Sequence, residues 1–377
     1  MKKILSVLAA LTLTASLLAG CSGKAASTPA ETVGQAESVS AAESTMESAA
    51  ETETVSQQET TVAETEGSQP AEASGEETAV RVMALKGPTA MGMVQLMDTA
   101  EAGPVGGNAY EFTIAASADE VTPRLGQGDA DIAAVPANLA SVLYNNTEGK
   151  IQVLAVNTLG VLYIVESGDT VQTAADLKGK TIYASGKGST PEYALNYILS
   201  SNGIDPEKDV TIEWKSEHSE CVAALSSGEG GIAMLPQPFV TTAQAKNDSI
   251  RIALDLTKEW DALQAGAETS SALITGVVVV RADFAAENPE AVSAFLDSYK
   301  ESVDFVNGST EDAAALIEKY DIVPAAVAVK ALPYCNITFI EGTEMKEKLS
   351  GYLNVLFGQN PKAVGGKLPA DDFYYSR

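Results

Sequence analysis

The residues best suited to do chemistry lie in the stretch Gly-Lys-Gly-Ser-Thr-Pro-Glu, which begins at position 186. Pro191 suits the first turn of a helix, Ser189 or Thr190 can cap that turn, and Ser189 with Glu192 has the spacing of a capping box. The first backbone N–H groups of a helix lack intrahelical partners, which makes this loop a site for a polar or anionic group. Helix capping without a ligand is the alternative. The predicted ligand contacts here are Ser185, Gly186, Gly188, Ser189 and Thr190.

Other loops offer polar or aromatic groups of the same kind. Lys86 supplies a charge unless it is simply solvated, and Asn138 and Gln237 supply amides. Phe239 either stacks on a ligand ring or belongs to the core. His218, the single His of the chain, begins a predicted helix and either contacts ligand or is a partly exposed polar residue. The predicted contacts outside the first loop are Lys86, Gly87, Pro88, Thr89, Pro136, Asn138, Thr158, His218, Gln237 and Phe239.

The composition argues against several kinds of chemistry. With one His and three Cys, a zinc site or a Ser-His or Cys-His catalytic pair is not expected. The sequence also contains no carboxylate pair, nucleotide loop or metal cluster that stands out, so we predict no catalytic residue, metal or cofactor. Beyond Cys21, the chain has only Cys221 and Cys335, which are expected to be buried free thiols, with one disulfide as the alternative.

The elements that position these loops follow a weak internal repeat. The segment GDADIAAVP, from Gly128, matches GEGGIAMLP, from Gly228, and both read Gly-acid-x-x-Ile-Ala-x-aliphatic-Pro. Leu125 and Leu225 keep the same offset upstream. Each copy alternates short apolar strands with amphipathic helices, which predicts parallel sheets with right-handed crossovers. The predicted strands are 81–85, 110–116 and 132–135, then 180–184, 210–214 and 232–235; the predicted helices are 90–100, 118–127 and 137–145, then 191–201, 218–227 and 237–246.

Two α/β lobes of one plan, with ligand loops after the strands, predict a cleft and a hinge between them. The apolar run 153–165 is long enough to finish one lobe and lead into the next, 169–178 is read as a linker, and 272–280 as the return. Helices at 289–306, with Asn288 as N-cap, 310–320, 324–332 and 343–357 form a C-terminal segment that packs on the first lobe. The predicted lobes are 80–165 with 272–377, and 166–271.

The N-terminal part of the chain is expected to lie outside the fold. Lys2 and Lys3 precede an apolar run to Leu18, which is typical of a signal peptide covering residues 1–20. The sequence Leu-Ala-Gly-Cys that ends at Cys21 resembles a bacterial lipobox, in which the Cys receives a lipid anchor. An ordinary signal peptide is the alternative.

Residues 21–79 are expected to form a disordered acidic tether, or less favourably a partner-binding tail. From Ser22 to Thr78 the chain has twelve Glu, one Lys and no Phe, Tyr or Trp. Such a composition buries too little apolar surface to offset the entropy of ordering. The whole chain has a net charge of −27, which argues against a nucleic-acid partner.

The lipobox, the tether, the duplicated plan, the string AADLKGK from Ala174 and the Gly-Ser-Thr loop together resemble substrate-binding proteins of ABC importers. They are similar in particular to the type II periplasmic-binding-protein group that includes sulfonate, taurine, nitrate and thiamine-pyrimidine binders. The resemblance covers about residues 80–360 and implies a contact of the Ser-Thr pair with an anionic group. The absence of Arg from the predicted cleft loops puts a strongly anionic ligand in doubt.

The sequence and this resemblance together predict a monomeric, lipid-anchored protein on the outer face of the cytoplasmic membrane. It would capture a small polar or aromatic solute by lobe closure and deliver it to an ABC permease, without being an enzyme. Two alternatives stay open. One is an enzyme of the same fold that builds the thiamine pyrimidine, for which the expected Cys cluster is missing. The other is a ligand-sensing partner of a signalling receptor.

Overall fold

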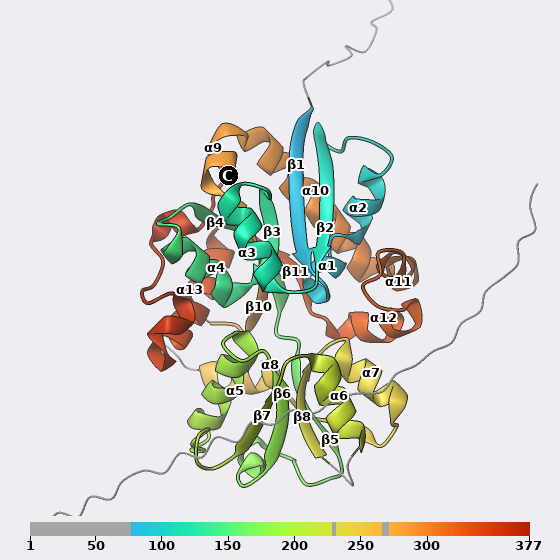
Figure 1. Cartoon of the computed structure of the whole chain (residues 1–377), viewed down its shortest axis with the longest axis vertical. Coiled ribbons are helices and arrows are strands. Elements are labelled where there is room, and N and C mark those ends of the chain that lie inside the picture. The colour runs from blue at the N-terminus through green and yellow to red at the C-terminus, as the bar shows by residue number, and fades with distance from the viewer. Residues whose placement is uncertain (1–76, 228–230, 266–270) are drawn as a thin grey trace, which may run out of the picture. The chain divides into compact units, whose positions relative to one another are not determined.

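The computed structural model describes residues 77–227, 231–265 and 271–377. Their strands form one sheet of six strands and one of five, which we call lobe 1 and lobe 2 with the helices that cover them (Figure 1). The predicted signal peptide, Cys21 and nearly all of the predicted tether lie outside the described residues. Among the described residues, no helix combines the length and the apolar character needed to cross a bilayer.

Lobe 1 has the strand order β11-β4-β10-β3-β1-β2 and lobe 2 the order β7-β6-β8-β5-β9. The strands of lobe 1 are β1 (Thr78–Leu85), β2 (Asn108–Ala115), β3 (Ile132–Pro136), β4 (Ile151–Leu159), β10 (Ile274–Arg281) and β11 (Ile337–Ile340). Those of lobe 2 are β5 (Leu162–Ser167), β6 (Thr181–Ser185), β7 (Thr211–Lys215), β8 (Gly231–Pro236) and β9 (Ile250–Asp255).

The helices occupy the connections and the C-terminal segment. They are α1 (Pro88–Met91), α2 (Val94–Ala100), α3 (Ala118–Gln127), α4 (Ala137–Asn146), α5 (Thr190–Ser201), α6 (His218–Ser227), α7 (Phe239–Lys246), α8 (Leu256–Gln264), α9 (Ala282–Glu287), α10 (Pro289–Gly308), α11 (Thr310–Lys319), α12 (Ala325–Ala331) and α13 (Gly342–Gln359). Short 3₁₀ turns are η1 (Ala174–Leu177), η2 (Leu332–Tyr334), η3 (Pro361–Val364) and η4 (Asp371–Phe373).

The internal repeat is a structural duplication. Val82 pairs with Phe112 between β1 and β2, and Ile182 pairs with Ile212 between β6 and β7, which is the same register one repeat later. The helices α3 and α6 likewise begin and end at matching positions of the two copies. The predicted helices 118–127 and 218–227 are confirmed to the residue. The other repeated elements are confirmed with shifts at their ends, except for the predicted helix 90–100, which is two helices.

Both sheets are mixed, so the prediction of parallel sheets is only partly right. The repeated strands pair in parallel, but β5 runs antiparallel to β8 and β9, and β10 runs antiparallel to β3 and β4. The cause is the route of the chain. Leu162 at the start of β5 lies opposite Pro236 at the end of β8, and Gly276 near the start of β10 lies opposite Pro136 at the end of β3. Each crossing strand enters its new sheet at the carboxyl edge and must run the other way.

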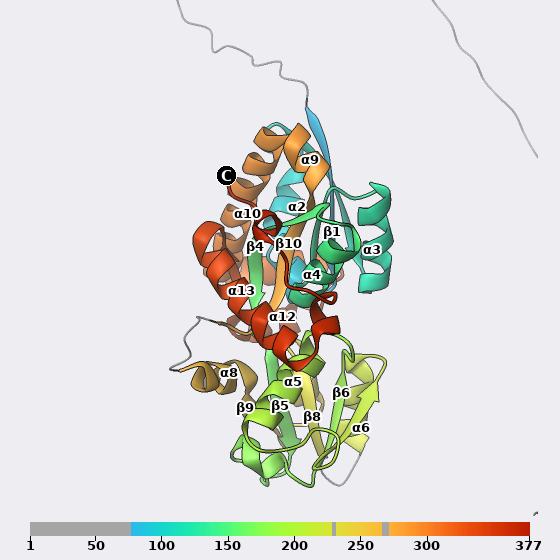
Figure 2. The same ribbon diagram turned by 90° about the vertical axis from the view of Figure 1, so that its left-hand side faces the viewer.

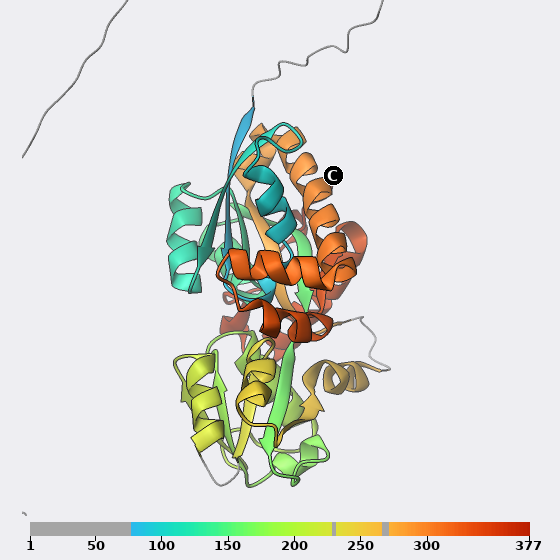
Figure 3. The ribbon, with the colours of Figure 1, turned by 90° about the vertical axis from the view of Figure 1, so that its right-hand side faces the viewer.

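Successive side chains of a strand point to opposite faces of its sheet, and in lobe 1 both faces are covered by helices. In β10, Val278 and Val280 belong to one apolar cluster, and Val277 and Val279 belong to another. The first cluster includes residues of α2, α10, α11 and α12, which Figure 3 shows along one side of lobe 1. The second includes residues of α3, α4 and α13. Two buried faces explain why the strands read as nearly continuous apolar runs.

The second cluster continues from lobe 1 into lobe 2. It includes Tyr352 of α13 together with Trp260 of α8 and Leu195 of α5, and the ring centroids of Tyr352 and Trp260 lie 5.5 Å apart. Figure 2 shows α13 in red, with α8 below it on the same side of the molecule. The C-terminal helix therefore packs against both lobes, whereas the sequence predicted contact with lobe 1.

The first crossing is shorter than the sequence indicated. The apolar run 153–165 covers most of β4 and the first part of β5, which belong to different sheets and are separated by Gly160 and Val161. A side chain at Gly160 would overlap Oγ1 of Thr257 and come within 2.9 Å of Leu273 Cδ2. The segment 169–178, predicted as a linker, instead follows β5 within lobe 2 and contains η1, which Thr173 and Asp176 cap.

Other differences follow from tertiary contacts. The predicted helix 90–100 is broken into α1 and α2 at Gly92, where a Cβ would lie 3.1 Å from Oη of Tyr299. Asn288 makes no side-chain cap to α10, and its Nδ2 donates instead to the Phe284 carbonyl. The sequence reading missed β9, α8, α9 and β11.

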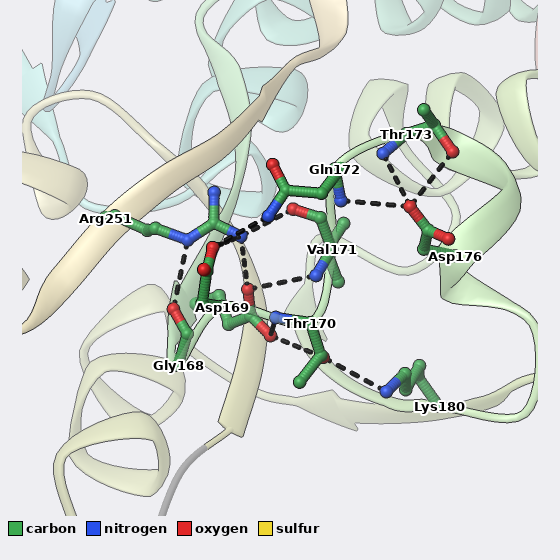
Figure 4. A network of polar contacts seen from close by, with 10 residues as sticks. Gly168, Asp169, Thr170, Val171, Gln172, Thr173, Asp176, Lys180 and Arg251 are labelled. Atoms are coloured by element: carbon green, nitrogen blue, oxygen red, sulfur yellow. Dashed lines mark hydrogen bonds and ion pairs between the residues drawn. The ribbon is translucent and has the colours of Figure 1, made fainter.

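A polar network closes the end of β5 (Figure 4). The Glu166 side chain is 3% exposed, accepts hydrogen bonds from N and Oγ1 of Thr170, and pairs with Arg251 Nη2 at 2.7 Å. Glu166 lies opposite Ile232, at the amino end of β8. This network therefore lies at the edge of lobe 2 opposite to the predicted ligand loops.

Burial of Glu166 favours a raised pKa, but hydrogen bonds from Thr170 and Val171 and the pair with Arg251 lower the pKa of this carboxyl below its ordinary value. A group whose folded-state pKa is lowered contributes stability above its unfolded-state pKa. The network therefore contributes fully at neutral pH, and its contribution is lost as the pH falls through the folded-state pKa of Glu166.

We expect Arg251→Met to lower the free energy of unfolding at neutral pH by about 2–4 kcal/mol, because Glu166 stays buried without its cation. The deficit should shrink in acid, where Glu166 is protonated in both states. Urea unfolding at several pH values measures this. Asp169→Asn is the control, because Asp169 is 84% exposed and 3.4 Å from Arg251, so it should cost less than about 1 kcal/mol. A deficit that does not change with pH would contradict the assignment.

Candidate functional site

Three predicted site residues come together at the carboxyl edge of lobe 2. Ser185 ends β6, His218 begins α6 after β7, and Phe239 begins α7 after β8. The Ser185 hydroxyl is hydrogen-bonded to Nδ1 of His218, and the ring centroids of His218 and Phe239 lie 5.0 Å apart with the planes at 47°. These three neighbouring strands are parallel, so their carboxyl ends share one edge. We call Ser185, His218 and Phe239 the strand-end cluster.

The two rings of this cluster are accessible and uncharged. Ser185 is 2% exposed, whereas His218 and Phe239 are half-buried. Burial lowers the pKa of His218 to about 4, so the imidazole is neutral at physiological pH. A neutral imidazole has one donor and one acceptor nitrogen. Since Nδ1 is used by Ser185, Nε2 is the nitrogen left for another molecule.

Both thiols are buried and free, as the sequence favoured. Cys221 belongs to an apolar cluster of lobe 2 and Cys335 to a cluster of lobe 1. Burial is the main cause that raises the pKa of Cys221, and it raises that of Cys335 to about 12, so neither is a reactive thiolate. Within the three described ranges, no group of three His, Cys, Asp or Glu residues is placed to hold a metal ion.

The hydroxyl groups of Thr89 and Thr158 are buried in lobe 1 and already bonded there. Thr89 Oγ1 donates to the Leu85 carbonyl at 2.8 Å, and Thr158 Oγ1 donates to Asn157 Oδ1 at 3.2 Å. Asn157 Nδ2 in turn donates to the Thr89 carbonyl at 3.3 Å. A Cβ on Gly276 would lie 2.6 Å from both Asn157 Oδ1 and Thr89 Cγ2. These residues form a tight joint between α1, β4 and β10.

Asn138 and Thr190 meet each other across the lobes. Thr190 Oγ1 donates to Asn138 Oδ1 at 3.4 Å and accepts from Tyr352 Oη at 3.0 Å. Asn138 Nδ2 donates to the carbonyl of Ala363, which follows α13. Asn138 and Thr190 are 3% and 1% exposed, so in this structure both connect lobe 1, lobe 2 and the C-terminal segment.

The predicted capping box at α5 does not form. Ser189 is the N-cap residue, but its hydroxyl donates to the Gly186 carbonyl at 2.8 Å and accepts nothing from the helix. Glu192 reaches past Ser189 and accepts from the backbone N of Gly188 at 2.6 Å. Both hydrogen bonds join residues of the loop itself to one another or to the first turn of α5. The Glu192 carboxylate therefore already lies at the start of the helix.

Gln237 is buried beside a cavity of about 610 Å³ between the lobes. Its Oε1 accepts from N and Oγ1 of Thr241. Residues of α7 and β9 line one side, and α12 with η2 lines the other, where Tyr334 is 51% exposed. The Tyr334 carbonyl also accepts from Tyr163 Oη at 3.1 Å, which links the lobes beside the cavity.

The remaining predicted residues differ in exposure. Lys86 is exposed and forms an ion pair with Asp321 at 3.0 Å, in the loop after α11. Gly87 is buried and Gly188 exposed. The half-buried predicted residues, which retain surface for another molecule, are Pro88, Pro136, Gly186, Ser189, His218 and Phe239.

Sequence reasoning missed Tyr352, Tyr334 and Tyr163, which connect the lobes. The sequence gives no signal for them, because each acts through one hydroxyl or carbonyl on a residue far away in the chain. Sequence reasoning also missed Asn336, which has a positive φ of 43° and whose Nδ2 donates to the carbonyl of Gly160 at the crossing. Asn is among the residues that adopt positive φ most readily, but the residue type alone does not single out this position.

A family model described as "ABC transporter, phosphonate, periplasmic substrate-binding protein" matches residues 104–330, more than half of the chain. A curated relative, the "Putative binding protein YtlA" of Bacillus subtilis, is 31% identical over 70 residues. That stretch covers 19% of this chain and only 21% of the relative.

Solved structures share the fold. An ABC transporter structure from Parabacteroides distasonis is 24% identical and covers 80% of this chain and 99% of its own, with a TM-score of 0.67. The periplasmic aliphatic sulphonate binding protein SsuA from Escherichia coli is 18% identical and covers 80% and 93%, with a TM-score of 0.62. At these identities the likeness establishes the two-lobed α/β fold, as expected from the sequence.

We expect Tyr352→Phe to lower the free energy of unfolding by about 1 kcal/mol, because it removes the hydrogen bond to Thr190 and keeps the ring packing. Tyr193→Phe is the matched control, since the Tyr193 hydroxyl of α5 makes no hydrogen bond to a described residue. Chemical denaturation measures both. Equal effects of the two variants would mean that the hydrogen bond between Tyr352 and Thr190 adds no stability.

Proposed function

This chain belongs to the phosphonate family of periplasmic substrate-binding proteins of ABC transporters, and on that premise we propose that it captures a small polar or aromatic solute between its two lobes and delivers it to a permease. Proteins of this family bind solutes outside the cytoplasm and are not enzymes. The observation that carries the proposal is the strand-end cluster, in which Ser185, His218 and Phe239 converge from three strand ends.

The half-buried loops of both lobes support a cleft between them. In lobe 1, Pro88 follows β1 and Pro136 ends β3; in lobe 2, Gly186 and Ser189 follow β6. Ligands of open α/β sheets bind beyond the carboxyl ends of the strands. The boundary expected after residue 165 falls inside β5, which belongs to the sheet of lobe 2. We therefore place the lobes at 80–160 with 272–377 and at 161–271, and infer that they close on the solute.

Closure would bend the two crossing segments. Lobe 1 passes into lobe 2 at Gly160, and the chain returns through Leu273 into β10. Both crossings pack together, because Leu273 lies against the backbone of Gly160. A hinge of two adjacent segments permits rotation of one lobe on the other. Closure would also shift the contacts away from the crossings that join the lobes, among them the hydrogen bond between Tyr352 and Thr190.

The N-terminal sequence supports a membrane anchor. Cys21 would carry the lipid, and the acidic segment to residue 79 would hold the lobes away from the bilayer surface. We propose that the chain is a monomer on the outer face of the cytoplasmic membrane, where a permease receives the solute.

We expect Cys21→Ser to move the protein from the membrane fraction to the soluble fraction, because the thioether lipid can no longer be attached. Cell fractionation followed by detection of the chain measures this. Cys221→Ser is the control and should leave the distribution unchanged. Membrane retention of the Cys21→Ser protein would refute the anchor.

We expect Gly160→Ala to lower the free energy of unfolding by about 1–3 kcal/mol and to prevent compaction, because the new methyl group overlaps Thr257 at the hinge. Gly358→Ala, at a helical glycine with no atom within 4 Å of the added Cβ, is the control. Small-angle scattering with and without a metabolite extract that stabilises the chain measures closure. A radius of gyration that stays constant in the native chain would refute closure.

A further inference from the structure

The hydroxyl of Ser185 lies where two side chains of α6 meet the end of β6. His218 and Cys221 are three residues apart, so they share one face of that helix. Ser185 Oγ is hydrogen-bonded to Nδ1 of His218. Burial raises the pKa of the Cys221 thiol, and a hydrogen bond with Ser185 lowers it. One hydroxyl proton thus has two acceptors within reach, and the one that it takes decides what the imidazole can do.

The imidazole is uncharged, so its two nitrogens differ. Burial lowers the pKa of His218 to about 4, and at neutral pH the ring carries a single N–H. With that proton on Nδ1, the ring would donate to Ser185, and the Ser185 proton would have to turn to another group. With the proton on Nε2, Nδ1 accepts the proton of Ser185 instead. The positions of the heavy atoms fit both arrangements, and the surroundings of Ser185 select one of them.

The burial of Ser185 makes the choice. Ser185 is 2% exposed, so its proton needs an acceptor within the protein. Among the described residues, the acceptors that its hydroxyl reaches are Nδ1 of His218 and the sulfur of Cys221. A thiol sulfur is a weak acceptor, whereas the bare nitrogen of an imidazole is a strong one. The Ser185 proton therefore goes to Nδ1, and the S–H of Cys221 is free to donate weakly to the Ser185 oxygen.

The ring of Phe239 supports the imidazole from another side. The ring centroids of His218 and Phe239 lie 5.0 Å apart with the planes at 47°, within the range of favourable aromatic pairs. A ring held by a hydrogen bond at Nδ1 and by an aromatic contact has a fixed direction for Nε2. His218 is half-buried, and its Nε2 makes no hydrogen bond to a described residue. This nitrogen is therefore available to another molecule.

We propose that Ser185 is a positioning residue, which donates to Nδ1 of His218 and keeps the ring proton on Nε2. His218 then presents a fixed hydrogen-bond donor, so the group that it recognises on the solute is an acceptor atom, such as a carbonyl or oxyanion oxygen. A group that can only donate, such as an ammonium, finds no acceptor on this ring. This inference rests on the proposed function and specifies one polar contact of its solute.

The single imidazole of the chain permits a direct test. In the purified full chain, labelled with ¹⁵N-histidine and kept in mild detergent, the His218 ring gives the only labelled ring-nitrogen signals. The shift of each nitrogen shows whether it carries a proton, and coupling to the carbon-bound ring proton Hδ2 identifies Nε2. At neutral pH we expect a protonated Nε2 and an unprotonated Nδ1. A proton on Nδ1 of the native chain would overturn the inference.

Variants show whether Ser185 is the cause. Ser185→Ala should give a mixture of both tautomers, because no hydroxyl then donates to Nδ1, and Ser185→Thr, which keeps a hydroxyl, should restore the native spectrum. Cys221→Ala should leave the tautomer unchanged, because the thiol is not the acceptor. Ser226→Ala is the control: it removes a hydroxyl of the same helix that donates to the Val222 carbonyl at 2.8 Å. A native tautomer in Ser185→Ala, or a changed one in Cys221→Ala, contradicts the proposed role.

A binding experiment connects the ring to the solute. Thermal unfolding with increasing amounts of a metabolite extract detects binding, because a ligand that binds only the folded state raises the midpoint. We expect Ser185→Ala to need about five- to tenfold more extract than the native chain for the same rise, and Ser185→Thr to need the native amount. In the saturated native chain Nε2 should keep its proton. Loss of that proton would mean that the solute donates to His218, and the inference would fail.

The two measurements separate this inference from the function on which it rests. If the extract stabilises the native chain and Ser185→Ala equally, the role of Ser185 is refuted and the solute-binding function stands. If Nε2 carries the proton but the extract stabilises neither chain, the proposed function fails and only the assignment of the tautomer stands.

Discussion

The structure depends on how the chain crosses between its two sheets. At Gly160 the backbone lies so close to the side chains of Thr257 and Leu273 that any added side chain would force them to move, and both crossing segments meet there. Each crossing enters the next sheet at its carboxyl edge, which forces β5 and β10 to run antiparallel to their neighbours β8 and β3. The loops that follow the repeated strands lie at the same carboxyl edges as the crossings. In each lobe, these loops therefore lie on the side that is joined to the other lobe. The position of the candidate site is thus a consequence of the crossings.

The duplicated half of the fold could be predicted because its information is local. Apolar positions such as Leu125 and Leu225 recur at one offset, and α3 and α6 begin and end where the periodicity indicates. The bridging half could not be predicted, because its determinants are distant pairs. The break between α1 and α2 reflects Tyr299, more than two hundred residues from Gly92, and β11 is added beside β4 from the far end of the chain.

The candidate site shows the same division. The types and positions of the site residues could be predicted: His218 stands out as the single imidazole, and Phe239 lies where a strand ends. Their hydrogen-bond partners could not be predicted. Ser189 and Glu192 have the right spacing for a capping box, yet Glu192 reaches Gly188 because Ser189 turns back to Gly186. From the sequence, Thr190 is expected to contact the ligand, but in the structure its hydroxyl is hydrogen-bonded to Tyr352 and Asn138. A sequence lists the groups that can bond and leaves open which of them do.

The apolar cluster that runs from lobe 1 through α13 into α5 and α8 has a consequence for how the molecule melts. Two lobes with separate cores would unfold as two calorimetric transitions. Here Tyr352, Trp260 and Leu195 share one interior, so loosening lobe 2 would expose the inner face of the C-terminal helix and weaken lobe 1 with it. We therefore expect the two lobes to unfold as one cooperative unit, even though each has its own sheet.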